Sequence, residues 1–297
     1  MTCSASPVIA SPPTPDLGLF GPHSTVWHVD REIAVLLGSG SRALMLQVAH
    51  PKVAAAVDAH SRYRSDPLGR LRDTLNSIYG FTFASMPEVD RILGHIHHLH
   101  THVRGRTAGG EPYTALDPHL LLWVYATLID SSLLAYETFV APLTLAQREQ
   151  YYADLRRVGP LWGIRPSDFP DTLVGLRFWM ADRIRSGEVH VSPQGRYVGR
   201  FLLEPKGWWL PPPAALLLRQ STVWQLPPSL REGFGYSWGP RREAAMRSLA
   251  ALSRAIVPRL PHALRDLPTA RSAYRRVRRA EARAAAGGAV PGALPPR

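Results

Sequence analysis

The chain has almost no cysteine: Cys3 is the single thiol in 297 residues. One cysteine cannot close an internal disulfide or supply the several thiolates of a zinc ribbon, so both kinds of scaffold are excluded. This cysteine usage is typical of a reducing compartment, and we expect a cytoplasmic protein. Because 45% of its residues are hydrophobic, the chain has ample material for a large core.

Familiar catalytic and nucleotide-binding motifs are missing as well. The sequence contains no GxSxG, HExxH, Walker A or CxxC motif. The nearest match to a dinucleotide fingerprint is "GSGSR" at 38–42, which lacks the third glycine and follows a helix-like segment. We interpret it as a turn between two helices.

Signals for export or membrane insertion are weak. The opening "MTCSASPVIASPPTPD" has no basic n-region and no apolar h-region, which predicts a disordered Pro/Ser tail rather than a secretory signal. The longest apolar run, 120–140, approaches the length of a membrane span. Asp130 lies in its middle, where a carboxylate facing lipid is costly, so a buried core helix is favoured.

Positive charge dominates the chain, with a net charge of +12 carried mostly by arginine. Seven of the arginines lie between Arg265 and Arg283. Such a run could contact nucleic acid or anionic lipid. No aromatic-studded basic groove, zinc finger or helix-turn-helix signature accompanies it, so a solvated basic helix is favoured and no nucleic-acid partner is expected.

Helical periodicity runs through the chain, and strand-like alternation is almost absent. Helix starts are indicated at Asp66–Pro67, Asp117–Pro118 and Thr144, a break at Pro51, and glycine stops at Gly38 and Gly105. The sequence therefore predicts an all-α fold with a single multi-helix domain over 24–284. Disordered tails are expected over 1–23 and 285–297.

Five of the twelve histidines lie between His95 and His102, on one predicted helix. At about 100° per residue, the apolar residues of this helix form one stripe, and His100 lies inside it. The stripe consists of Val89, Ile92, Leu93, Ile96, Leu99 and Val103. His95, His98 and His102 gather on the opposite, polar face, and His97 is near the border.

Each of these two groups of histidines has two interpretations. A histidine on an apolar face is either a core residue bonded to a carbonyl or carboxylate, or a single imidazole ligand such as haem iron takes. The spacing of His95, His98 and His102 could chelate a surface Zn²⁺ or Ni²⁺. No Asp, Glu or Cys nearby completes that set, so a solvated face is favoured for the trio.

A second candidate constellation lies in "DPLGRLRDTL", where Arg70 and Thr74 are four residues apart on one side of a helix. An arginine and a hydroxyl at the margin of an apolar stripe could position an oxygen-containing ligand or a haem propionate. Alternatively, Thr74 bonds its own helix and Arg70 pairs with Asp66 or Asp73.

Several of these segments, taken in order, resemble the MpaB-type oxygenase family, which includes latex-clearing protein (rubber oxygenase) and the mycophenolate-pathway enzyme that cleaves a farnesyl side chain. The segments are "REIAVLLGSGSRALMLQVAHPKVAAAVDAHS", "DPLGRLRDTL", "HTHVRG", "DPHLLLWVYATLIDS" and "LPPSLREGFGYSWGPRR". The resemblance covers roughly residues 24–280.

The resemblance implies an all-α fold that encloses haem b, with a histidine as the iron ligand. The family pattern H-x-x-V-R-G matches His100, Val103, Arg104 and Gly105, so the implied ligand is the histidine inside the apolar stripe. The distal pattern R-x-x-x-T of rubber oxygenases matches Arg70 and Thr74. Where those enzymes can carry a lysine that caps the iron, this chain has Asp73, which argues against such capping.

The function implied by the resemblance is that of a haem-dependent oxygenase, which uses O₂ to cleave a C=C bond of an apolar, isoprenoid-like substrate. Asp58 and Asp130 are the candidates for the carboxylate base that the family implies. Because such a substrate partitions into lipid, peripheral membrane contact is compatible with this function. The alternative is a non-catalytic haem- or lipophile-binding helical protein.

Overall fold

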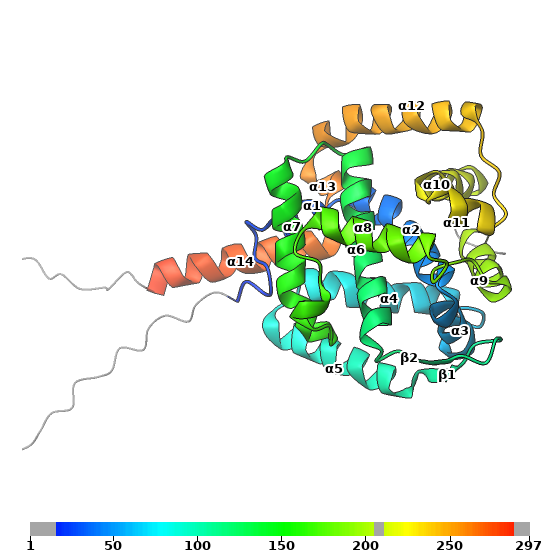
Figure 1. The fold of residues 1–297 in the computed structure, drawn as a ribbon. Coiled ribbons are helices and arrows are strands. Elements are labelled where there is room, and N and C mark those ends of the chain that lie inside the picture. The colour runs from blue at the N-terminus through cyan, green and yellow to red at the C-terminus, as the bar shows by residue number, and fades with distance from the viewer. Residues whose placement is uncertain (1–15, 205–210, 288–297) are drawn as a thin grey trace, which may run out of the picture.

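The computed structural model describes residues 16–204 and 211–287, and its elements confirm the all-α fold (Figure 1). The α-helices are α1 Thr25–Asp30, α2 Ile33–Ala49, α3 Pro51–His60, α4 Pro67–Phe83, α5 Met86–His102, α6 Pro118–Phe139, α7 Leu145–Val158, α8 Leu173–Arg185, α9 Pro193–Leu203, α10 Pro212–Gln225, α11 Pro228–Gly233, α12 Pro240–Ile256, α13 His262–Arg265 and α14 Pro268–Gly287. One hairpin of β1 Arg104–Arg106 and β2 Pro112–Thr114 is the only sheet within the described ranges.

The centre of the fold is the pair α2 and α6, which lie against each other through most of their length (Figure 1). The glycine stop predicted at Gly38 and the turn predicted at 38–42 are both wrong, because α2 continues through them to Ala49. A Cβ on Gly38 would lie 2.8 Å from the ring of Phe139 and 3.0 Å from the Cβ of Ala135. Gly38 therefore serves close helix packing, which the sequence could not reveal.

The predicted core helix is confirmed as α6. In the apolar 18-residue window of this helix, 67% of the residues are buried inside the protein. Of the helices described, α6 is the one long and apolar enough to cross a membrane, and α2 with α3 would qualify only as a broken pair. The break predicted at Pro51 is confirmed, since α2 and α3 meet there at an angle of 106°.

The predicted helix starts are also confirmed. Asp66 accepts a hydrogen bond from Gly69 N, and Pro67 opens α4. Asp117 caps α6 in the same way, and Thr144 begins α7 with a capping box. These caps depend on side chains within three residues of the backbone groups they satisfy, so local sequence is enough to predict them.

The first described residues, from Asp16, and the last helix, α14, lie at the same side of the molecule (Figure 1). Residues 16–23, which the sequence placed in the N-terminal tail, lie against α4 and α5: Asp16 accepts from Met86 N, and Phe20 packs on Phe81. At the other end, α14 runs to Gly287, beyond the predicted boundary at 284. The rest of the two predicted tails, 1–15 and 288–297, lies outside the described residues.

Candidate functional site

The helices α4 and α5 form an antiparallel hairpin joined by Ala84 and Ser85. Gly80 lies against Ile92 near the turn, so closely that a Cβ on Gly80 would be 2.6 Å from Ile92 Cδ1. In such a hairpin the start of the first helix and the end of the second lie at the same end. Arg70 and Thr74, in the first half of α4, and His100, in the last turn of α5, therefore lie toward one end of the hairpin.

His100 is half-buried, and its ring has no hydrogen-bond partner among the described residues. Burial and the neighbouring His97 both lower the pKa of His100. Because the ordinary pKa of histidine is already below 7, this imidazole is neutral at physiological pH and keeps a lone pair for an electrophile. A neutral, unpartnered imidazole is the form that a metal ion requires.

The other four histidines of α5 are exposed. His102 Nδ1 forms a hydrogen bond with the carbonyl oxygen of His98 at 2.9 Å, and the centroids of the two rings lie 4.8 Å apart. No group of three or more His, Cys, Asp or Glu residues is placed to hold a metal ion in the part of the chain that the structure describes. Within the described residues His95, His98 and His102 do not form such a group, and all three are exposed, as the prediction of a solvated polar face expects.

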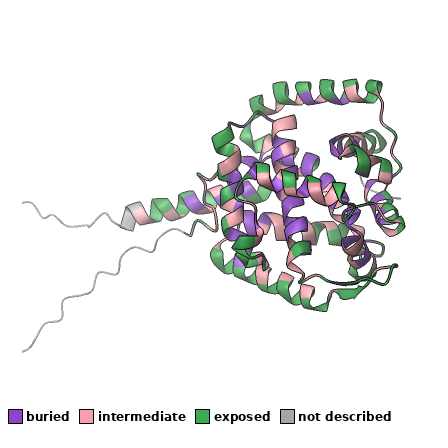
Figure 2. Cartoon of the chain, viewed as in Figure 1, coloured by how far each residue is buried: buried purple, intermediate pink, exposed green. Residues whose placement is uncertain are grey.

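The apolar stripe of α5 is only partly buried. Val89 at its start has no exposure, but Leu99, one residue before His100, is 49% exposed. The apolar stripe is therefore not covered along its whole length. On α4, Leu68 is 51% exposed, and Figure 2 shows α5 as mostly exposed or intermediate. The apolar faces of both helices are thus incompletely covered at the end that carries His100.

Arg70 and Thr74 contact each other across one helical turn. Arg70 Nη1 donates to Thr74 Oγ1 at 2.5 Å and its Nε donates to Ser61 Oγ at 3.2 Å, while Thr74 Oγ1 donates to the Arg70 carbonyl at 2.8 Å. The neighbouring carboxylates are engaged elsewhere, since Asp66 caps α4 and Asp73 pairs with Arg62. Thr74 thus bonds its own helix, but Arg70 keeps a guanidinium without a carboxylate partner among the described residues.

The hairpin that follows His100 fixes the end of α5. The helix ends at His102 rather than at Gly105 as predicted, because residues 104–106 pair with residues 112–114. A Cβ on Gly105 would lie 2.6 Å from the hydroxyl oxygen of Tyr113, so a glycine is needed where the strand crosses this ring. Tyr113 is buried and its hydroxyl is 3.4 Å from His60 Nε2 at the end of α3. The one signal for this hairpin was the pair Gly109–Gly110 at its turn.

The two candidate base carboxylates are both engaged. Asp130 is clasped by Arg42 and Arg177, each at 2.8 Å. Burial alone would raise the pKa of Asp130, but the two guanidinium groups outweigh it and hold that pKa below its usual range. Asp58 accepts from Tyr63 at 2.7 Å and from Gln194 at 2.8 Å, and also pairs with Arg64. Both carboxylates are structural acceptors in this arrangement.

Two hollows are found elsewhere on the described surface, of about 480 Å³ and about 290 Å³. The larger is lined by α1, α7 and α14, and the smaller by residues of α9, α10 and the segment around Tyr236. Neither includes Arg70, Thr74 or His100. The enclosed haem pocket that the sequence predicts is therefore not one of these two hollows.

Comparison with known proteins finds a family match. The family model described as "ER-bound oxygenase mpaB/B'/Rubber oxygenase, catalytic domain" matches residues 27–255. The chain belongs to this family. The matched range contains α2 to α6, and with them Arg70, Thr74 and His100, and it ends before α13 and α14. No curated protein and no solved structure matches the chain.

Membership of this family confirms the resemblance and supports an oxygenase activity in general terms. It does not by itself assign the cofactor, the substrate or the role of any one residue.

Proposed function

We propose that the protein is a haem b-dependent oxygenase that acts with O₂ on an apolar, alkene-containing, isoprenoid-like substrate by oxidative C=C cleavage or a related oxygenation. The observation that carries the proposal is the state of His100. Its imidazole is neutral and unpartnered, and it lies at the same end of the α4–α5 hairpin as an arginine without a carboxylate partner.

The residues at this end of the hairpin fit a haem. One imidazole suffices as the protein ligand of haem iron, whereas zinc takes three or four. The guanidinium of Arg70 would suit a haem propionate, and the incompletely covered apolar side chains would suit a large flat macrocycle. When bound, haem would supply the metal centre that binds O₂.

The roles of the residues follow from their contacts. His100 would hold the iron, and the β1–β2 hairpin keeps the end of its helix fixed against α3. Arg70 donates to Thr74 and so holds that hydroxyl in one place, where it would help to position a bound group. Asp73 forms an ion pair with Arg62. Position 73, where rubber oxygenases can carry a lysine that caps the iron, therefore holds no side chain that would compete for it.

The iron ligand is tested by the matched pair His100→Ala and His102→Ala, both on the last turn of α5. With haem precursor supplied during expression, His100→Ala is expected to lose haem, and His102→Ala is expected to keep it at the wild-type ratio. The reverse result would exclude His100 as the ligand, and haem retention by both variants would exclude both of these histidines.

Enzymatic function is tested separately from haem binding. Wild-type holoprotein is expected to consume O₂ only when an isoprenoid is added, with carbonyl products appearing in proportion. Haem-loaded protein that consumes no O₂ with a panel of such alkenes would instead support the non-catalytic haem- or lipophile-binding alternative.

A further inference from the structure

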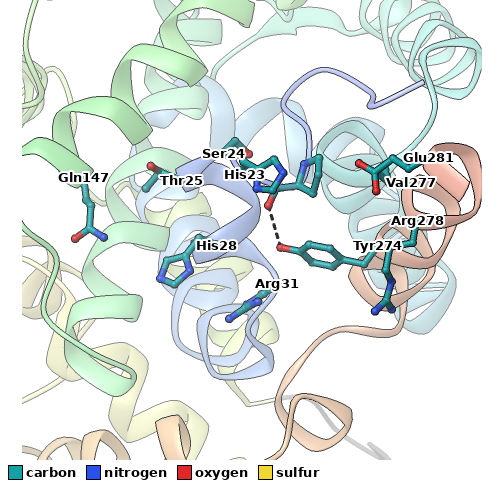
Figure 3. A pocket seen from close by; sticks show the side chains of 11 residues that line it. His23, Ser24, Thr25, His28, Arg31, Gln147, Tyr274, Val277, Arg278 and Glu281 are labelled. Carbon is teal, nitrogen blue, oxygen red and sulfur yellow. Dashed lines mark hydrogen bonds between the residues drawn. The ribbon is translucent and has the colours of Figure 1, made fainter. Parts of the chain in front are cut away.

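The hollow of about 480 Å³ lies far from the hairpin end that carries His100, at the point where α14 leaves the body of the protein (Figures 1 and 3). Its walls come from three segments: residues 22–31 around α1, Gln147 of α7, and the first half of α14 from Tyr274 to Glu281. It shares no residue with the proposed haem site.

The lining of this hollow is rich in hydrogen-bond donors and positive charge. Arg31 of α1 and Arg278 of α14 both contribute guanidinium groups, and Figure 3 shows them close to the ring of Tyr274. Thr25 and Gln147 add a hydroxyl and an amide, while Glu281 is the only carboxylate in the lining. A ligand that complements such walls must consist mainly of acceptors and carry negative charge.

Arg31 lies beside two carboxylates but has one nitrogen without a hydrogen bond. Its Nε is buried and has no hydrogen-bond partner among the described residues. The nearest carboxylate oxygens, on Glu32 and Asp266, are 3.5 Å and 3.7 Å from this nitrogen. Glu32 already accepts hydrogen bonds from two nitrogens of Arg265, Nε and Nη2. Leaving a buried donor unsatisfied costs free energy, and an acceptor that reached this nitrogen would recover it.

Around the hollow, the positive charge comes from the arginines of α14 and not from His28. His28 is held by Tyr136, whose hydroxyl oxygen is 2.7 Å from its Nε2, and burial together with Arg31 lowers the pKa of His28. It therefore adds no charge at neutral pH. Beyond the hollow, α14 carries exposed arginines at 275, 279 and 283 and continues away from the body (Figure 1), so the positive field extends outward from this site.

We propose that this hollow binds a phosphate group, presented either by a soluble small molecule or by the headgroup of a phospholipid. Arg278 has no ion-pair or hydrogen-bond partner among the described residues, and Arg31, which lies beside Glu32 and Asp266, keeps one nitrogen without a hydrogen bond, so the hollow offers charged donors to an oxyanion such as phosphate. The volume of the hollow exceeds that of phosphate alone, so the phosphate would be the head of a larger molecule. This site is independent of the proposed oxygenase function.

Titration of the full-length protein with inorganic pyrophosphate, followed by calorimetry at about 0.15 M salt, tests the site. The variants are Arg278→Gln, in the lining, and Arg279→Gln, which removes the same charge at the next exposed position of α14 but lies outside the lining. Arg278→Gln is expected to weaken binding about tenfold or more, and Arg279→Gln to stay within about twofold of wild type. Equal loss in both variants, or no binding to wild type, would overturn the proposal.

The source of the phosphate is distinguished by vesicles of phosphatidylcholine with or without phosphatidylglycerol. If a phospholipid headgroup is the ligand, wild-type protein binds the anionic vesicles, Arg278→Gln binds them more weakly than Arg279→Gln, and pyrophosphate competes. If pyrophosphate binds but vesicles do not compete with it, the ligand is a soluble phosphate. A third outcome would contradict a site in the hollow: both variants lower vesicle binding equally, and pyrophosphate has no effect on it. Such a result would show a general attraction of anionic vesicles to α14.

Discussion

Two glycines of α2, Gly38 and Gly40, are expected to respond to alanine with opposite signs. Alanine is about 1 kcal/mol more favourable than glycine inside a helix. At Gly40 the nearest side-chain atom to an added Cβ is Leu36 Cδ1 at 3.9 Å, an ordinary contact, so Gly40→Ala is expected to stabilise the protein by about 0.5–1 kcal/mol.

At Gly38 the same methyl group would clash with side chains of α6. It would lie 2.8 Å from two ring carbons of Phe139 and 3.0 Å from the Cβ of Ala135, both on α6. Phe139 is buried at 7% exposure, so its ring has little room to move away. Overpacking of this kind costs about 1–3 kcal/mol, which offsets or exceeds the gain in helix propensity. Gly38→Ala is therefore expected to be destabilising by up to about 2 kcal/mol.

Urea unfolding of both variants measures these changes, and thermal unfolding should show midpoints that separate by several degrees. The comparison is internal, because the two substitutions are identical and lie two residues apart on one helix. Equal stabilisation by both would mean that α2 and α6 are not packed as closely as the structure has them, and the account of the central helix pair would be refuted.

Three further predictions concern buried charge and the candidate site. Burial raises the pKa of Asp30 to about 7, above its unfolded value of 3.8, so the free energy of unfolding should fall by a few kcal/mol as pH rises from about 4 to 7. Asp30→Asn should flatten this slope in unfolding measurements, and an unchanged slope would contradict the raised pKa. Arg70→Ala and Thr74→Ala should keep haem but lower O₂ turnover, whereas the control Arg72→Ala, at an exposed position of the same helix, should match wild type. Wild-type turnover in the first two variants would remove Arg70 and Thr74 from the site. Asp130→Ala leaves two arginines without their shared carboxylate and should cost about 3–5 kcal/mol by urea unfolding, with a loss under about 1 kcal/mol showing that the pairing contributes little.

The sequence predicted those features of the fold that depend on local chemistry. The caps at Asp66, Asp117 and Thr144 and the break at Pro51 each rest on neighbouring residues, and all are confirmed. The prediction of a helix stop at Gly38 was wrong because the role of this glycine is set by Phe139, about a hundred residues away in the chain. Propensity alone treats such a glycine as a stop.

For the candidate site, periodicity separated the histidines of α5 correctly into one half-buried ring, His100, and a solvated face. It could not predict that Leu99 would be 49% exposed, because a helical wheel gives the direction of a side chain and not what covers it. Nor could it reveal that Asp73 would turn to Arg62 and leave Arg70 without a carboxylate. Pairings among several nearby charges are settled only by tertiary geometry.

The most direct test of the central claim is the absorption spectrum of the protein expressed with haem precursor, recorded oxidised, reduced and reduced with CO. The account predicts a Soret band that corresponds to nearly one haem b per chain and shifts when CO binds at an open iron position. A folded but colourless protein would contradict it, and would mean that the free imidazole of His100 does not hold iron in this member of the family.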